Sequence, residues 1–344
     1  MNSKLPEEIN IDILSRTSLK TFDAMCCTSK EISKLKYDPY FLHLYKQRNN
    51  IVSGFLVQHI NGFHEFAPSH DSTPLDLGFL SPDDRILAAS EKGIIVFESP
   101  HWQKLYHVCK PATNQVFELP NPNRTENLTE KVAIMVVGSN PFRYKILRLS
   151  QPNPSFSQQW DGRYTTYCCE IFDSATLSWR LLEDTKLPYD VFVTISSQPI
   201  TVGGSIYLLL TNNDVLNFDF YSEKWTVIRL QIPTRFDILK LVKYEGNLAL
   251  VCKPPNGGWE IWVINGTMNH SSSWKKTFVF NKKERMFLNS FYDSDTSVLV
   301  DFNTLVFYKF KKGDDSMSNK VVLSDMIATT FAFRSDFEPI DLTS

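Results

Sequence analysis

The chain has 344 residues, of which 42% are hydrophobic and 22% are charged, and its formal net charge at pH 7 is −2. This length is typical of about two domains. The balanced charge and the isolated pairs Lys282-Lys283 and Lys311-Lys312 argue against a nucleic-acid partner. No stretch reaches the roughly 18 apolar residues of a membrane span, and we expect no signal peptide. The composition therefore predicts no membrane partner and a location in the cytoplasm, the nucleus or both.

Residues 1–48 have the pattern of three short amphipathic helices and a fourth that starts at Asp38-Pro39. Pro6 suits the first turn of a helix, Ser18 is a candidate N-cap for a second one, and Asp38-Pro39 predicts the start of another. The apolar positions recur at helical spacing, at Leu5, Ile9, Ile13 and Leu14 and then at Phe22, Met25 and Cys26. A segment this small must bury its apolar stripes against the rest of the chain or against a partner.

This segment resembles an F-box, the module that docks a protein onto the Skp-type adaptor of a cullin-based ubiquitin ligase. The resemblance rests on Leu5-Pro6, Ile13-Leu14-x-Arg16, Cys27-x-x-Lys30 and Asp38-Pro39-x-Phe41. It implies a Skp-type adaptor and a cullin scaffold as partners. The residues it implies for adaptor binding are Leu5, Pro6, Ile9, Ile13, Leu14, Phe22 and Cys26.

The segment departs from the F-box pattern at two places. Thr17-Ser18 follows Arg16 where the family usually has Leu-Pro, and Ile32 stands where the family usually has Trp. Smaller apolar side chains reduce the area available for docking, which weakens binding in proportion. A degenerate F-box that binds partners without assembling a ligase is therefore a second hypothesis.

From about residue 51 onward, short runs rich in Val, Ile, Phe and Tyr alternate with turn residues, which predicts an all-β domain. Examples of these runs are residues 94–99, 132–138, 206–210 and 248–253. Four segments repeat a turn followed by a strand that carries an aromatic residue, at Phe117, Trp179, Trp225 and Trp274. Their spacings of 62, 46 and 49 residues are typical of β-propeller blades. These aromatic residues are expected to anchor the blades, and the three tryptophans are expected to be largely buried at equivalent places.

The repeat predicts a propeller of about six blades, with seven as the alternative. Five blades are bracketed by residues 80–120, 131–183, 192–233, 236–280 and 287–323. Pairing of residues 327–333 with residues 51–56 would make a sixth blade and close the ring, which removes exposed sheet edges. A β-sandwich is the competing fold, but it does not require one turn-plus-aromatic unit to recur. The predicted organisation is a small all-α domain at 1–48, a propeller at 51–335 and a C-terminal tail at 336–344.

The β half also carries a family resemblance. Gly203-Gly204 followed by Ile206-Tyr207-Leu208 resembles a kelch repeat, and residues 110–120 resemble the kelch-related F-box-associated domain of many plant proteins. Together with the N-terminal segment, the resemblance implies a substrate-recognition subunit of a ubiquitin ligase that holds a target protein on the propeller.

The polar stretch at 151–163 looks like an insertion between strands. Phe156 and Trp160 within it are candidate target contacts, because exposed aromatic side chains make good anchors. The alternative is a disordered loop with one aromatic residue packed back onto its blade.

Motifs for chemistry are missing from the sequence. It has no His-Glu-x-x-His pair, no Gly-x-Ser-x-Gly elbow and no glycine-rich phosphate loop. We therefore expect no metal, no cofactor and no catalytic residues. A kelch-like enzyme or a sugar-binding propeller is the alternative from another functional class.

Overall fold

The computed structural model describes most of the chain. The described residues are 6–35, 38–49, 51–69, 72–100, 104–139, 141–152, 163–195, 197–230, 238–254, 258–265, 273–280, 286–291, 296–309, 316–335 and 340–343.

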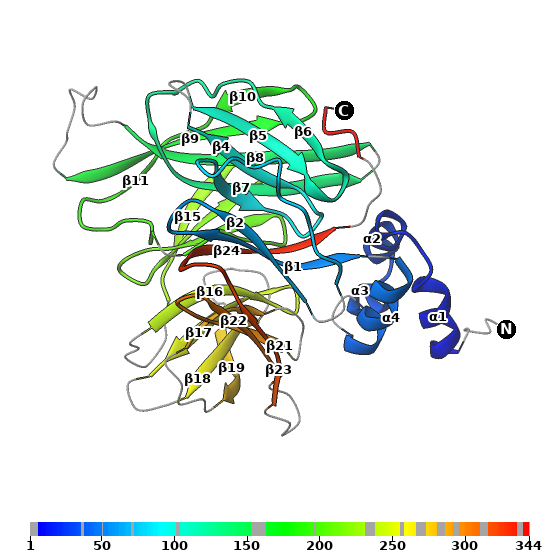
Figure 1. Cartoon of the computed structure of the whole chain (residues 1–344). Coiled ribbons are helices and arrows are strands. Elements are labelled where there is room, and N and C mark those ends of the chain that lie inside the picture. The colour runs from blue at the N-terminus through cyan, green and yellow to red at the C-terminus, as the bar shows by residue number, and fades with distance from the viewer. Residues whose placement is uncertain are drawn as a thin grey trace.

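Four helices stand at the N-terminus and are grouped at one side of the molecule (Figure 1). They are α1 (Glu7–Leu14), α2 (Leu19–Thr28), α3 (Lys30–Leu35) and α4 (Pro39–Asn49). The hydroxyl of Ser18 caps α2 by accepting a hydrogen bond from the Thr21 amide at 3.2 Å, as the sequence predicted. The Asp38 carboxylate caps α4 in the same way by accepting from the Phe41 amide at 2.7 Å.

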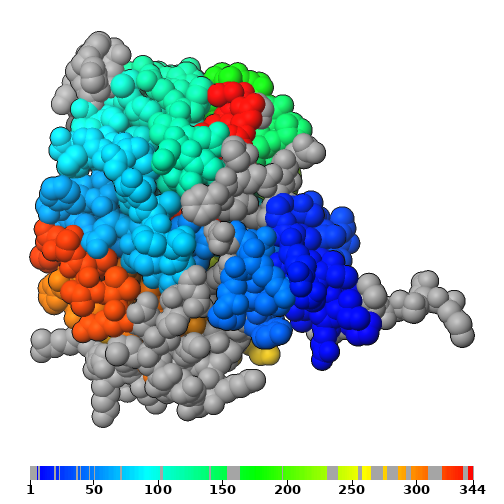
Figure 2. Space-filling view, turned by 45° about the vertical axis from the view of Figure 1, so that its right-hand side comes forward, coloured from blue at the N-terminus to red at the C-terminus, as the bar shows by residue number. Residues whose placement is uncertain are grey.

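The helices share a small aromatic core of their own. Phe22 of α2 packs against Phe41 and Tyr45 of α4, with ring centroids 4.9 and 5.1 Å apart. This core continues onto the sheet through Ile51, and the Arg334 guanidinium lies 5.6 Å from the centroid of the Tyr45 ring. The helices therefore form a lobe that rests on the propeller through α4 (Figure 2).

The rest of the described chain forms the predicted propeller of six blades. Blade 1 holds β3 (Arg85–Ala89), β4 (Ile95–Ser99), β5 (Leu105–Lys110) and β6 (Gln115–Glu118). Blade 2 holds β7 (Leu128–Ser139), β8 (Phe142–Gln151), β9 (Tyr164–Asp173) and β10 (Ser178–Leu181), with β11 (Thr185–Pro188) added to β9. Blade 3 holds β12 (Ile200–Val202), β13 (Ser205–Leu209), β14 (Val215–Asp219) and β15 (Lys224–Ile228).

The remaining blades follow in chain order. Blade 4 holds β16 (Ile238–Tyr244), β17 (Asn247–Lys253), β18 (Trp259–Asn265) and β19 (Ser273–Phe280). Blade 5 holds β20 (Phe287–Phe291), β21 (Thr296–Asp301), β22 (Thr304–Lys309) and β23 (Ser316–Val322). Blade 6 joins the two ends of the domain, β24 (Ile327–Ser335) with β1 (Val52–His59) and β2 (His64–Pro68).

The ring closes where the sequence predicted. β1 and β24 pair antiparallel from Val52↔Ser335 to Gln58↔Thr329. Gly54 lies in the middle of β1, and a Cβ added there would stand 2.2 Å from the carbonyl oxygen of Ala67 on β2. The close approach of β2 to β1 therefore requires glycine at this position.

The direction of the inner strands follows from the strand count. Each of blades 1–5 has a path of four antiparallel strands, so the chain enters and leaves a blade at the same end. The six inner strands, which are β3, β7, β12, β16, β20 and β24, thus run the same way along the axis. We call the end where they begin, near Thr329 and Gln198, the N-face. The end where they finish, near Ser335 and Glu91, is the C-face.

Three of the four predicted blade anchors occupy equivalent places. Trp179, Trp225 and Trp274 are each the second residue of an outer strand, and each packs toward the preceding blade. They are partly buried, whereas the sequence predicted that they would be largely buried. Phe117 is the third residue of β6, so it faces the following blade and meets Trp179 across the same interface.

The end of the chain packs onto the propeller. Ile340 and Leu342 join the apolar cluster between blades 1 and 2. The Tyr144 hydroxyl donates to the Leu342 carbonyl at 2.8 Å, and the Gln115 side chain donates to the Ile340 carbonyl at 2.7 Å. The described part of the predicted tail is therefore part of the folded domain.

A fully buried ion pair lies within blade 2, at its boundary with blade 1. Arg148 of β8 and Glu170 of β9 both have 0% exposed side chains, and their closest N–O distance is 2.5 Å. The guanidinium also donates to the Thr129 hydroxyl at 2.9 Å, the Tyr106 hydroxyl at 3.2 Å, and the carbonyls of Asn127 and Arg124 at 3.0 and 3.1 Å. Each nitrogen of the guanidinium donates at least one hydrogen bond. Such bonding is the condition under which a buried ion pair is tolerated.

Replacing Glu170 with Gln should destabilise the propeller, because it leaves the Arg148 charge buried without a counter-ion. We expect a loss of about 3–5 kcal/mol in the free energy of unfolding, measured by urea denaturation. Glu223→Gln is the matched control, since Glu223 pairs with the exposed Arg180 at 2.6 Å. That substitution should cost about 0–1 kcal/mol. Equal losses in the two variants would show that the buried ion pair contributes no more to the free energy of unfolding than the exposed one.

Candidate functional site

The structure divides the seven residues predicted to bind the adaptor. Leu5 lies outside the described residues. Ile9 and Ile13 are 46% and 48% exposed, and Pro6 is also exposed. Leu14 and Phe22 are buried, and Cys26 is partly buried beside them. The exposed part of the predicted surface is therefore the outer stripe of α1.

Leu14 and Phe22 correct the predicted surface. Both lie in the core shared by the four helices, where Phe22 contacts Phe41 and Tyr45. A helix of two turns presents one stripe to its neighbours and another to solvent, and the sequence stripe does not separate the two. These two side chains hold the helices together and are not available to a partner.

Charged groups border the exposed stripe of α1. The Asp12 carboxylate lies 3.3 Å from the Arg16 guanidinium and 2.9 Å from that of Arg48 on α4. Hydrogen bonds from the two arginines lower the pKa of Asp12 below its usual value. Ile9 and Ile13 thus form a small apolar stripe with a paired-charge border, as at many protein interfaces.

The residues that depart from the F-box pattern have local structural roles. The Thr17 hydroxyl donates to the Leu14 carbonyl at 2.7 Å at the end of α1, and Ser18 caps α2. Ile32 of α3 packs against the helical core. The turn between α1 and α2 is therefore built by hydroxyl groups that satisfy backbone groups at the helix ends.

The predicted target contacts, Phe156 and Trp160, lie outside the described residues. The flanking strands β8 and β9 respectively end and begin at the N-face. Four exposed apolar side chains gather beside them and form what we call the N-face patch, namely Tyr164, Tyr189, Phe192 and Ile195. Backbone bonds from the Tyr189 amide to the Arg163 carbonyl and from Thr211 to Phe192 hold this patch together.

The N-face patch has no clear signature in the sequence. Tyr189 and Ile195 are 62% and 85% exposed, yet they flank a β-rich segment and resemble ordinary strand residues in the sequence. The only local signal is that they follow Pro188 in a stretch with little alternation. Their exposure depends on how blades 2 and 3 are joined.

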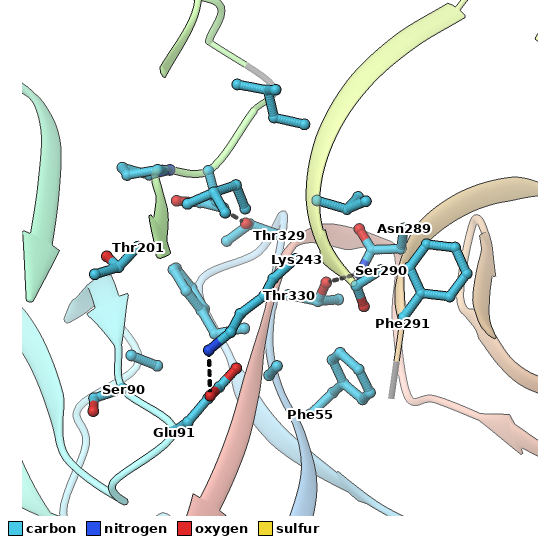
Figure 3. A pocket seen from close by; sticks show the side chains of 18 of the residues that line it. Phe55, Ser90, Glu91, Thr201, Lys243, Asn289, Ser290, Phe291, Thr329 and Thr330 are labelled. Carbon is cyan, nitrogen blue, oxygen red and sulfur yellow. Dashed lines mark hydrogen bonds and ion pairs between the residues drawn. The ribbon is translucent and has the colours of Figure 1, made fainter. Parts of the chain in front are cut away.

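A pocket of about 420 Å³ opens on the propeller axis and is lined by the inner strands of the blades. Two contacts cross the axis between opposite blades (Figure 3). The Lys243 ammonium of blade 4 lies 2.6 Å from the Glu91 carboxylate of blade 1 toward the C-face. The Gln198 amide before blade 3 donates to the Thr329 hydroxyl of blade 6 at 2.8 Å toward the N-face. A second cavity of about 630 Å³ lies beyond Gln198 and Thr329.

A chain of polar side chains joins blades 4, 5 and 6 along the pocket wall. The Lys240 ammonium donates to the Asn289 Oδ1 at 2.7 Å, and the Asn289 amide donates to the Thr330 hydroxyl. Burial lowers the pKa of Lys240 to about 8. No sequence pattern pointed to this site, because a lysine within a strand resembles a solvent-facing position in an alternating pattern.

The described part of the chain holds no group of three or more His, Cys, Asp or Glu side chains placed to bind a metal ion. None of its helices combines the length and the apolar character needed to cross a membrane.

Several known proteins are similar to this chain over much of its length. F-box protein At5g41720 of Arabidopsis thaliana is 30% identical over 166 residues, which cover 44% of this chain and 88% of that protein. F-box protein DOR of the same plant is 25% identical over 298 residues, which cover 77% of this chain and 72% of that protein. Among solved structures, the fungal lectin of Aleuria aurantia, a six-bladed propeller, aligns with a TM-score of 0.44 and 10% identity over 81% of this chain and 99% of that one.

The model of one protein family matches residues 42–322, which begin within α4 and extend through β23. The chain therefore belongs to the F-box associated beta propeller domain family.

Proposed function

We propose that the chain is the substrate-recognition subunit of a cullin-based ubiquitin ligase and has no catalytic role of its own. The observation that carries this proposal is the pairing of an F-box associated propeller with a separate helical lobe whose first helix exposes an apolar stripe. Relatives that share most of this chain are named F-box proteins. The helical lobe binds a Skp-type adaptor, which joins it to the cullin, and the propeller holds the target.

Adaptor docking is assigned to the outer stripe of α1. Ile9 and Ile13 lie one helical turn apart, so they present a continuous surface. The lobe keeps its own core through Phe22, Phe41 and Tyr45, so binding does not require it to unfold. A few apolar anchors of this kind carry most of the binding energy in protein interfaces.

Target binding is assigned to the N-face patch. The helical lobe leads into β1, which begins at the C-face opposite Ser335, so the lobe and the patch lie toward different ends of the propeller. Figure 1 shows β11, which ends next to the patch, on the side away from the helices. A target bound there does not compete with the adaptor for space.

Replacing both Ile9 and Ile13 with Ala should weaken adaptor binding without unfolding the lobe. Burial of such side chains contributes about 1.5–3 kcal/mol each when complete. We expect a total loss of about 2–4 kcal/mol, or roughly thirtyfold or more in Kd. The measurement is the affinity of the purified chain for a Skp-type adaptor by interferometry, together with a thermal melt.

Two further variants separate docking from folding. Ile60→Ala removes an isoleucine that is 66% exposed on the propeller, and it should leave adaptor binding unchanged. Leu14→Ala removes a core side chain and should lower the melting temperature of the lobe. If the wild-type chain melts cooperatively but binds none of several Skp-type adaptors, the ligase proposal fails and the scaffold hypothesis takes its place.

Replacing Tyr189 and Ile195 with Ala should release the target while keeping the adaptor. We expect proteins that co-purify with the wild-type chain, and with the Ile9→Ala/Ile13→Ala variant, to be lost from this variant. The reason is that exposed aromatic and aliphatic anchors at the centre of an interface dominate its affinity. Quantitative mass spectrometry of captured proteins measures the change.

The matched control lies at the C-face and on an outer strand. Tyr221 and Val227 are 85% and 50% exposed, and replacing both with Ala should leave the captured proteins unchanged. Loss of the same proteins from this control and retention in the Tyr189→Ala/Ile195→Ala variant would move the target site away from the N-face patch.

A further inference from the structure

Lys240 carries a positive charge inside the propeller without a carboxylate partner in the described part of the chain. Its one hydrogen bond there runs to a neutral amide, the Asn289 Oδ1 at 2.7 Å. An ammonium has three donors, so two of them have no protein acceptor among these residues. A charge removed from bulk water is costly unless it is paired, which makes this lysine unusual for a purely structural residue.

Lys131 shows how the same fold satisfies a buried lysine that has only a structural role. Its ammonium donates to two backbone carbonyls, those of Ile195 at 2.7 Å and Ser197 at 2.8 Å. These bonds tie blade 2 to the segment that leads into blade 3. Lys240 has no such pair of acceptors and instead lines the axial pocket, where it keeps some accessible surface.

The other charged side chains of the pocket favour a negative ligand. They are Glu91, Lys92 and Lys243, so the lining has three cations and one anion. The one carboxylate already pairs with Lys243 across the axis at 2.6 Å. An unpaired positive charge in a concave site surrounded by protein attracts an anion more strongly than an exposed charge does.

The size and lining of the pocket define the rest of the ligand. A volume of about 420 Å³ lies in the range of small-molecule sites. Figure 3 shows the rings of Phe55 and Phe291 on one side of the pocket, and the polar ends of Asn289 and Thr330 joined near them. The hydroxyl of Ser290, which also lines the pocket, has no hydrogen-bond partner among the described residues. An organic acid with an apolar body complements this combination.

We propose that the axial pocket binds a small organic carboxylate, with Lys240 as its counter-ion and Asn289 fixing the position of the ammonium. The cross-axis pair Lys243–Glu91 stands at the C-face side of the pocket, and Gln198–Thr329 closes the N-face side. This inference goes beyond the proposed ligase function and does not depend on adaptor docking. It concerns the propeller alone.

Binding should weaken at alkaline pH. The pKa of Lys240, lowered by burial to about 8, leaves the ammonium mostly charged at pH 7 and mostly neutral at pH 9.5. A carboxylate ligand stays ionised over this whole range. Deprotonation of the lysine therefore removes the attraction, and affinity should fall as pH rises through about 8.

The experiment is calorimetric titration of the full chain with benzoate at pH 7 and low salt. We expect benzoate to bind, and its neutral analogue benzamide to bind at least tenfold more weakly. Lys240→Met should weaken benzoate binding at least tenfold. Lys224→Met, which alters an exposed lysine on β15, is the matched control and should leave the affinity unchanged.

A second variant tests the proposal even if Lys240→Met does not fold. Asn289→Asp keeps the side-chain size and gives Lys240 an internal carboxylate. It should therefore weaken benzoate binding as much as Lys240→Met does, while its melting temperature stays near that of the wild type. The proposal is overturned if benzoate does not bind, if benzamide binds as tightly, or if Asn289→Asp leaves the affinity intact. Tighter binding of an acetylated, amidated glutamyl peptide than of benzoate would also overturn it, because the carboxylate would then belong to a protein.

Discussion

Closure of the ring depends on one antiparallel pairing, between β1 near the start of the propeller and β24 at its end. These strands are more than 260 residues apart in the sequence, yet they register from Val52↔Ser335 to Gln58↔Thr329. Without this pairing, β1 and β24 would have exposed edges, and blades 1 and 5 would lose the apolar faces of blade 6 that pack against them. On the other edge of β1, Gly54 allows β2 to approach closely, because a side chain there would clash with the Ala67 carbonyl oxygen.

The same closure creates the axis of the molecule. Once six inner strands stand around a common centre, side chains from opposite blades come within hydrogen-bond distance, as in Lys243–Glu91 and Gln198–Thr329. These contacts cross the axis at the two ends of the axial pocket. Ring closure also fixes the position of the helical lobe, since α4 leads directly into β1 and Arg334 of β24 lies against Tyr45. The helical lobe, the N-face patch and the axial pocket are therefore placed by one pairing.

Much of the fold was predictable from local patterns. Helix signals at Ser18 and Asp38, together with a turn-plus-aromatic repeat of about blade length, were enough for four helices followed by six blades. The repeat also predicted equivalent positions for Trp179, Trp225 and Trp274, but not the reversed facing of Phe117, which a shift of one residue along β6 produces. Sequence spacing identifies strands but does not fix which face of a strand meets which blade.

The sequence by itself determined the order of elements, the two-part organisation and the apolar stripe of α1, because these depend on contacts between residues near each other in the chain. Only the tertiary structure decided that Ile9 and Ile13 face solvent while Leu14 and Phe22 face the helical core. It also decided the gathering of the N-face patch and the isolation of Lys240 from any described carboxylate. Each of these features depends on which distant segments pack together, and burial, exposure and pKa are set by those neighbours and not by the residue type alone.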